Sequence, residues 1–300
     1  MKRKHLMMIV PVMLVTLILT ACQSVTAPYN PKEKLGPQIN YTITGIDAGA
    51  GIMASTQKAL TEYPLAKNKW QLQTSSTAAM TSTLDKAIKY KQPIVITGWQ
   101  PHWMFKKYPI KFLKDPKNVY GKAEQIHTIT NKNLKKKDPG AYKLLSQFHW
   151  TPSEMSDVML QTNAGVDPAQ AAKNWIKKNP KRVAEWTKGV PKGNGKTLKM
   201  TYVAWDSEIA STNVISQVLD SMGYKTTIQA MEAQPMWLSV AKGSADATVS
   251  AWLPTTSGIY YKQYKNQIDD AGVNLNGARV GLAVPKYMKN INSIDDLVNK

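Results

Sequence analysis

Cysteine is almost absent from this sequence, with Cys22 the single one in 300 residues. A lone thiol cannot form a disulfide within the chain, which excludes a small secreted domain held together by disulfides. The four histidines lack metal-ligand spacing, and neither a Gly-x-Ser-x-Gly elbow nor a phosphate-binding loop is present. We therefore expect no metal ion and no cofactor, and the motifs of common enzymes are missing.

A hydrophobic run long enough to span a membrane is also missing near the start of the chain. The apolar run at residues 6–19 is short for a transmembrane helix and follows a cluster of three basic residues, which is typical of a signal peptide. Residues 19–22 read Leu-Thr-Ala-Cys and resemble a lipobox, which implies cleavage before Cys22 and attachment of a lipid to its sulfur. We predict a signal peptide over 1–21, then a lipid anchor and flexible tether over 22–40.

Acidic residues are scarce relative to basic ones, and the formal net charge is +19. Such a charge raises the possibility of nucleic-acid binding. The lysines, however, are scattered and lack interleaved aromatic side chains, as in residues 131–139. We expect a solvated basic surface beside anionic membrane or wall polymers, and no nucleic-acid partner.

An internal repeat organises the rest of the chain. Residues 41–103 and residues 198–257 both read strand, helix, strand, helix, strand, with Asp47 and Asp206 at corresponding positions. Strands that alternate with helices predict parallel sheets, so two α/β lobes are expected. Further candidate strands at residues 126–132 and 279–285 are natural places for the chain to cross between the lobes, as in a hinged clamp.

Three tryptophans stand at the carboxyl ends of predicted strands: Trp99, Trp205 and Trp252. Open α/β sheets bind ligands at this edge. A single tryptophan is usually a core residue, but three at equivalent positions favour a ligand cage. We expect core packing for five of the others: Trp70, Trp150, Trp175, Trp186 and Trp237.

A cage of indole faces suits a quaternary ammonium group, which has no N–H to donate and is attracted to π-faces. At about 2 kcal/mol for each desolvated face, three faces contribute roughly 6 kcal/mol. A micromolar site needs about 8 kcal/mol, so a second contribution is expected.

The glycine-rich stretch at residues 47–53 can supply that contribution. Gly51 and Ile52 begin a predicted helix, where free backbone N–H groups and the helix dipole favour a carboxylate. The same stretch also fits a tight strand-to-helix turn with no ligand. Together, a cage and an anion site describe a zwitterion with a methylated ammonium group, which is a betaine.

Four motifs carry a resemblance to a known family: GIDAGAGIM, ITGWQPHWMF, YVAWDSEIASTNVI and SAWLP. In this order they resemble the OpuAC-type glycine betaine-binding proteins, the lipid-anchored binding components of ABC importers. The resemblance implies a cage of Trp99, Trp205 and Trp252, with backbone donors at Gly51 and Ile52. It also implies ABC permease and ATPase partners at the extracytoplasmic face of the membrane, and no enzymatic activity. We expect a monomer.

The resemblance implies an α/β fold with two lobes, of the periplasmic-binding-protein-like type II, with the ligand in the cleft between them. We expect lobe 1 to contain residues 41–124 and 279–300, and lobe 2 to contain residues 125–278.

One position departs from the family pattern. A histidine five residues after the last cage tryptophan contacts the ligand carboxylate in the family, and Ser257 stands there in this chain. A serine has a shorter reach and no charge. Thr255 or Thr256 could replace it if the register slips.

The carboxylates and aromatic residues near the predicted cleft also fit other functions. Asp47, Asp206 and Glu208 fit a pair of catalytic carboxylates for glycoside hydrolysis, although the aspartates fit helix N-terminal caps better. A glycan-binding surface lipoprotein would also use aromatic faces. Within the resembling family, a preference for carnitine or choline is the alternative to glycine betaine and proline betaine.

Overall fold

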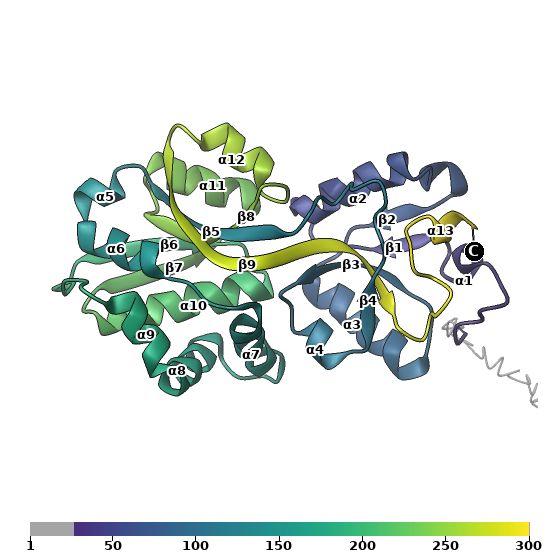
Figure 1. Cartoon of the computed structure of the whole chain (residues 1–300), viewed down its shortest axis with the longest axis horizontal. Helices are drawn as coiled ribbons and strands as arrows, with labels where there is room; N and C mark the ends of the chain where they lie inside the picture. The colour runs from purple at the N-terminus through teal and green to yellow at the C-terminus, as the bar shows by residue number, and fades with distance from the viewer. Residues whose placement is uncertain (1–26, 300) are drawn as a thin grey trace, which may run out of the picture.

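Two α/β lobes lie side by side along the long axis of the molecule, and the strand β9 runs through both of them (Figure 1). The computed structural model describes residues 27–299. The strands are β1 (Thr42–Thr44), β2 (Gln71–Gln73), β3 (Val95–Gln100), β4 (Ile110–Phe112), β5 (Glu124–Asn131), β6 (Thr197–Tyr202), β7 (Lys225–Ala230), β8 (Ala247–Leu253) and β9 (Ile268–Pro285). One lobe contains β1 to β4, and the other contains β5 to β8.

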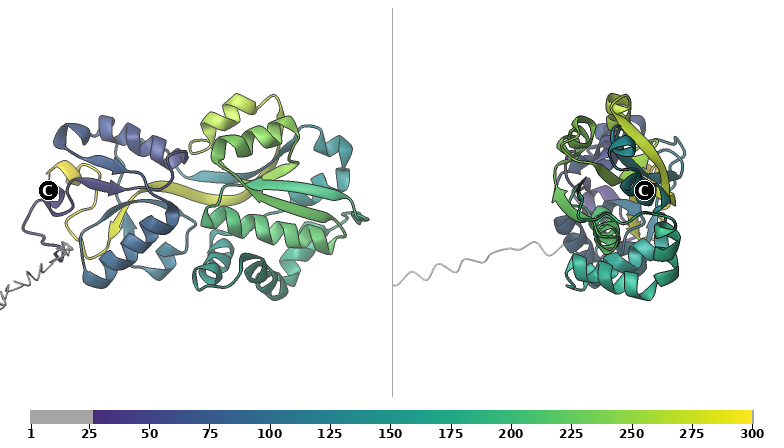
Figure 2. Two further views of the ribbon diagram at one scale, coloured as in Figure 1. Left: turned by 180° about the vertical axis from the view of Figure 1, so that it is seen from behind. Right: turned by 90° about the vertical axis from the view of Figure 1, so that its left-hand side faces the viewer.

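Helices cover both faces of the sheet, as the views from behind and from the end show (Figure 2). The helices of the β1–β4 lobe are α1 (Leu35–Gln38), α2 (Gly51–Glu62), α3 (Thr77–Tyr90), α4 (Met104–Lys107) and α13 (Asp296–Asn299), with a 3-10 turn at Ala66–Asn68. Those of the β5–β8 lobe are α5 (Leu134–Lys137), α6 (Pro139–Gln147), α7 (Pro152–Asn163), α8 (Pro168–Lys178), α9 (Pro180–Thr187), α10 (Asp206–Ser221), α11 (Ala233–Lys242) and α12 (Gly258–Tyr264).

The strand order is β2-β1-β3-β9-β5-β8-β6-β7, and β4 also pairs with β9. β1 pairs in parallel with β2 and β3, and β6 pairs in parallel with β7 and β8. The two α/β lobes expected from the repeat are therefore confirmed. The expectation of parallel sheets holds within the repeats but not beyond them, because β5 pairs antiparallel with β8, and β9 with β3, β4 and β5. A strand that arrives from the other lobe needs no helical crossover, so it can pair in either direction.

β9 joins the lobes through its pairing register. Ala278 pairs with Glu124 of β5, and the next residue, Arg279, pairs with Gln100 of β3. The predicted crossing segments at 126–132 and 279–285 fall largely on β5 and β9. Any change in the angle between the lobes must bend these strands.

The cores follow the expected patterns. All seven residues of β8 are buried, as expected for a strand covered by helices on both faces. The five tryptophans predicted to lie in the core are each 4% exposed or less: Trp70, Trp150, Trp175, Trp186 and Trp237.

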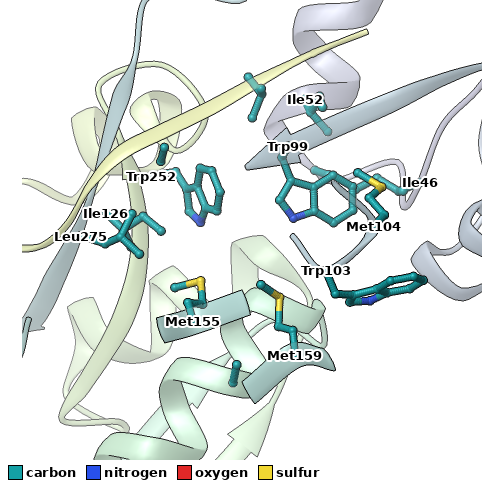
Figure 3. Close-up of a cluster of buried hydrophobic side chains, with 14 of the residues drawn as sticks. Ile46, Ile52, Trp99, Trp103, Met104, Ile126, Met155, Met159, Trp252 and Leu275 are labelled. Carbon is teal, nitrogen blue, oxygen red and sulfur yellow. The ribbon is translucent and has the colours of Figure 1, made fainter. Parts of the chain in front are cut away.

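The helical region between the two repeats also matches its sequence signals. Thr151 and Glu154 form a capping box at the start of α7, and Pro180 begins α9 directly after α8. α7 brings Met155 and Met159 into the same buried cluster as Trp99 and Trp252 (Figure 3).

Residues 27–40 differ from the flexible tether predicted for this part of the chain. Leu35 is fully buried, the Tyr29 N–H donates to the carbonyl of Lys91, and the amide of Gln38 donates to the carbonyl of Asn30. The segment therefore packs against the β1–β4 lobe. Hydrophobic periodicity misses such a segment because one buried leucine makes no repeating pattern.

The predicted signal peptide at 1–21 and the lipidation site at Cys22 lie outside the described residues. Within 27–299, no helix combines the length and the apolar character that crossing a bilayer requires.

The capping box of α7 can be tested by Thr151→Ala. Loss of the side-chain cap is expected to lower the free energy of unfolding by about 1 kcal/mol in a urea titration. Thr61→Ala, on the exposed surface of α2, is the control. It removes a threonine hydroxyl without touching a cap and should leave stability unchanged or slightly higher. Equal losses in both variants would contradict the role of Thr151.

Candidate functional site

A cavity lies at the boundary between the two lobes, and the predicted cage lines it. The empty space, including its open mouth, is about 350 Å³. Five of the six predicted binding residues meet there: Trp99, Trp205, Trp252, Gly51 and Ile52. The other lining residues are Ile46, Ala50, Ser207, Thr256 and Val280.

The aromatic walls come from both lobes. Trp99 is on β3 and Trp252 is on β8, and they are only 5% and 4% exposed. Their indoles lie beside each other across the boundary between the lobes (Figure 3). Trp205 precedes α10 and is partly exposed. A cation between these rings would contact π-faces from both lobes with little remaining access to water.

Trp205 is held by a hydrogen bond across the lobe boundary. Its Nε1–H donates to Oδ2 of Asp47, at 3.1 Å. Asp47 follows β1, so the donor and the acceptor belong to different lobes. The bond directs the polar edge of the indole toward the carboxylate.

A second group of hydrogen bonds crosses the boundary at Asp206. Its Oδ2 accepts from Nε1–H of Trp103 at 2.7 Å and lies 2.9 Å from Nε2 of His102. His102 is fully buried, and its ring packs on Trp99 with 4.5 Å between the centroids. The orientation of Trp99 therefore depends on the Asp206 contact through His102.

The protonation states at this contact agree with its geometry. Burial lowers the pKa of His102, although its bond to Asp206 opposes the shift. Burial alone would raise the pKa of Asp206, but the hydrogen bonds from His102 and Trp103 outweigh it and lower the pKa. The backbone N–H of Met104 donates to Nδ1 of His102 at 3.3 Å. A neutral imidazole with its proton on Nε2 satisfies both contacts with an ionised Asp206.

The N-terminus of α2 forms the part of the cavity opposite Thr256. The N-cap residue is Ala50, which has no side chain to accept from the first N–H groups of the helix. A Cβ on Gly51 would lie 2.0 Å from the carbonyl oxygen of Thr256 in the other lobe. Only glycine fits this approach, and the free amides of the first turn favour an anion.

Ser257 takes part in the loop after β8. Its hydroxyl accepts from the N–H of Trp252 at 3.2 Å, and its own N–H donates to the carbonyl of Trp252 at 2.7 Å. Ser257 is 9% exposed, and the neighbouring Thr256 lines the cavity instead. The serine therefore closes the turn that carries the cage tryptophan.

Sequence reasoning missed Glu124, which holds this loop from outside the cavity. Its carboxylate is buried and accepts from the N–H groups of Thr255 and Thr256 and from the Thr256 hydroxyl. The only sequence signal was a carboxylate at the start of a buried strand. Three donors compensate the burial of this charge.

The three carboxylates near the cleft have separate structural partners. Glu208 is 1% exposed and accepts from the N–H of Val203 at 2.7 Å, which holds the turn that carries Trp205. The interpretation of Asp47 and Asp206 as helix caps is wrong, because the N-cap residues are Ala50 and Trp205 and neither helix has a side-chain cap. Their acceptors face donors of the opposite lobe. Within the described part of the chain, no group of acidic, histidine or cysteine side chains could hold a metal ion.

Glu208 generates a pH-dependent prediction. Burial raises its pKa from 4.5 to about 8, and the Val203 hydrogen bond only partly opposes this. The fold thus favours the protonated carboxyl, whose contribution to stability is full below pH 4.5 and is lost as pH rises to about 8. Glu208→Gln keeps an acceptor and removes the titration. Relative to the original chain, its free energy of unfolding should increase between pH 5 and pH 8 in urea titrations.

The exposed Glu62→Gln is the matched control for Glu208→Gln. It removes an exposed carboxylate and so controls for the change from acid to amide itself. A difference between Glu208→Gln and the original chain that did not change with pH would show that Glu208 is ionised in the folded protein.

Comparison with known proteins places this geometry in a family. A family model described as the substrate binding domain of ABC-type glycine betaine transport system, OpuAC, matches residues 24–178 and 196–300. The glycine betaine/carnitine transport binding protein GbuC of Listeria monocytogenes is 65% identical over 279 residues, which is 93% of each chain.

Two solved structures are also similar. The lactococcal OpuAC structure, in a closed-liganded conformation with glycine betaine, is 49% identical with a TM-score of 0.49, over 54% of this chain and 63% of that one. The ProX protein of Borrelia burgdorferi is 31% identical with a TM-score of 0.49, over 55% and 63%. The matched part is less than two thirds of each of these structures. The family model, however, spans most of the present sequence, and the Listeria protein matches nearly all of it. The chain belongs to the family of substrate-binding domains of ABC-type glycine betaine transport systems, which bind a solute for transport and are not enzymes.

Proposed function

We propose that this chain captures glycine betaine outside the cytoplasm and delivers it to an ABC importer for osmoprotection. The observation that carries the proposal is the cavity in which indoles of both lobes meet the N-terminus of α2. The indoles offer π-faces to a trimethylammonium group, and the first amides of α2 offer hydrogen bonds to a carboxylate. Neither contact requires a formal charge on the protein.

Carnitine is the second candidate, because the Listeria relative is named for glycine betaine and carnitine. Carnitine has the same trimethylammonium group and the same carboxylate as a betaine, with a longer chain between them. Choline, which has no carboxylate, tests the anion site, and proline betaine tests the cage.

In the proposed mechanism, the solute binds to one lobe of an open cleft, and contacts from the second lobe complete the cage. Closure is favoured only by contacts that the open form lacks. We assign residues 41–124 and 279–299, together with the packed segment 27–40, to lobe 1 and residues 125–278 to lobe 2, with bending in β5 and β9. Lipid attachment at Cys22 would keep the monomer at the membrane, beside its permease and ATPase.

Calorimetry with glycine betaine, carnitine, proline betaine and choline tests the function. We expect the carboxylated ligands to bind more tightly than choline. Tighter binding of choline would refute the anion site. Binding of a glycan, or turnover of a glycoside, with no response to any betaine would refute the proposal as a whole.

The cage is tested by Trp99→Ala and Trp205→Ala. Each variant removes one face worth about 2 kcal/mol, so the dissociation constant for glycine betaine should rise about 30-fold. Tyr90→Ala removes a 48% exposed aromatic side chain on α3, and its affinity should not change. An unchanged affinity in the tryptophan variants would mean that the ligand lies elsewhere.

The anion site is tested by Gly51→Ala. The added methyl group would meet the Thr256 carbonyl oxygen when the lobes approach, so we expect affinity for glycine betaine to fall at least about tenfold. A Cβ on Gly49 meets nothing within 4 Å, so Gly49→Ala is the matched control. Both variants should still unfold in one cooperative thermal transition. Full affinity in Gly51→Ala would show that the Gly51–Thr256 approach is not needed for binding.

A further inference from the structure

The aspartates of the two repeats each accept an indole N–H from the opposite lobe. Asp47 follows the first strand of its repeat and accepts from Trp205. Asp206 follows the first strand of the other repeat and accepts from Trp103. The two bonds therefore cross the lobe boundary in opposite directions.

The Asp206 contact involves more side chains than the Asp47 contact. Asp206 keeps 31% of its side-chain surface exposed, whereas its partner His102 is completely buried. Both ring nitrogens of His102 are in contact, one with Asp206 and the other with the N–H of Met104. Separation of the lobes would leave the His102 and Trp103 donors without this acceptor. Hydrogen bonds to a charged group are stronger than neutral ones, so breaking these bonds costs free energy. The closed arrangement keeps them and is therefore favoured.

Neither aspartate caps a helix through its side chain. The N-cap residues are Ala50 and Trp205, and neither makes a side-chain cap bond. Asp206 is the first residue of α10, where a carboxylate suits the helix dipole, but that position does not require a partner in the opposite lobe. Neither carboxylate lines the cavity, where Trp205 and Trp99 themselves contact the solute space. The contacts of both aspartates instead form only where the lobes meet.

We propose that Asp47 and Asp206 are a pair of interlobe latches that hold the cleft closed and set the residence time of the bound solute. This proposal rests on the proposed function, since the residence time is that of a captured betaine. The latches act after the solute has entered. Their loss should therefore speed dissociation and leave association nearly unchanged.

The test is stopped-flow tryptophan fluorescence with glycine betaine on the full chain in detergent. Asp47→Ala should raise the dissociation rate about tenfold, the effect of losing one charge-assisted hydrogen bond. Asp206→Ala loses the contacts to both His102 and Trp103, so its dissociation rate should rise at least as much. The association rate should change less than about twofold. Asp206→Asn keeps one acceptor oxygen, so its dissociation rate should lie between those of the original chain and Asp206→Ala.

Asp157→Ala is the matched control. Asp157 pairs with Lys106 at 2.8 Å across the same lobe boundary, but it is 56% exposed. Exposed ion pairs contribute little, so its dissociation rate should stay within about twofold of the original. Unchanged dissociation in both Asp47→Ala and Asp206→Ala would overturn the latch. A fall in the association rate as large as the rise in the dissociation rate would overturn it too, because it would indicate a damaged cage.

Hydrogen exchange separates the latch from the proposed function. Without added solute, Asp206→Ala should increase exchange in residues 99–106 of one lobe and 203–213 of the other more than in segments away from the lobe boundary. Unchanged exchange would overturn the latch. If the original chain bound no betaine, the proposed function would fail, while increased exchange in the variant would still support an interlobe latch.

Discussion

The rest of the structure depends on one constraint, the contact between indole faces and the permanent cation of the proposed ligand. Such a cation has no N–H and cannot be held by hydrogen bonds, so the protein has to surround it with rings and keep water out. One ring cannot do this. Trp99 and Trp252 come from different lobes, so the cage exists only where the lobes meet. This requirement explains why the cavity lies at a boundary and not inside one lobe.

Holding the lobes in register is then a matter of strands and carboxylates. β9 continues from one lobe into the other and pairs with β5 and β3 on either side of the boundary. Glu124, at the start of β5, fixes the loop that follows Trp252. Buried or half-buried carboxylates here act as hydrogen-bond acceptors for the backbone and for indoles. Their position near a cleft resembles that of catalytic acids, but their partners are structural.

Much of the fold and part of the site could be predicted from residue patterns. The repeat of strands and helices indicated two lobes, because helical and strand periodicities differ. The segment at residues 27–40 was mistaken for a tether, since its burial rests on isolated side chains. The antiparallel pairing of β5 and β9 was also missed, because pairing direction depends on where a strand comes from in space. Ser257 illustrates a finer limit: its hydroxyl bonds the backbone of Trp252, which no spacing rule indicates.

The sequence by itself determined the α/β repeats, the placement of Trp99 and Trp252 near strand ends and of Trp205 just beyond one, and the glycine at the start of α2. These are local properties, set by side-chain periodicity and by backbone freedom. Only the tertiary structure decided how the surfaces of the two lobes meet. It brings Gly51 to the Thr256 carbonyl, and it lets Asp47 and Asp206 accept donors from the opposite lobe. These contacts join residues more than a hundred positions apart, and their geometry comes from the packing of the two lobes.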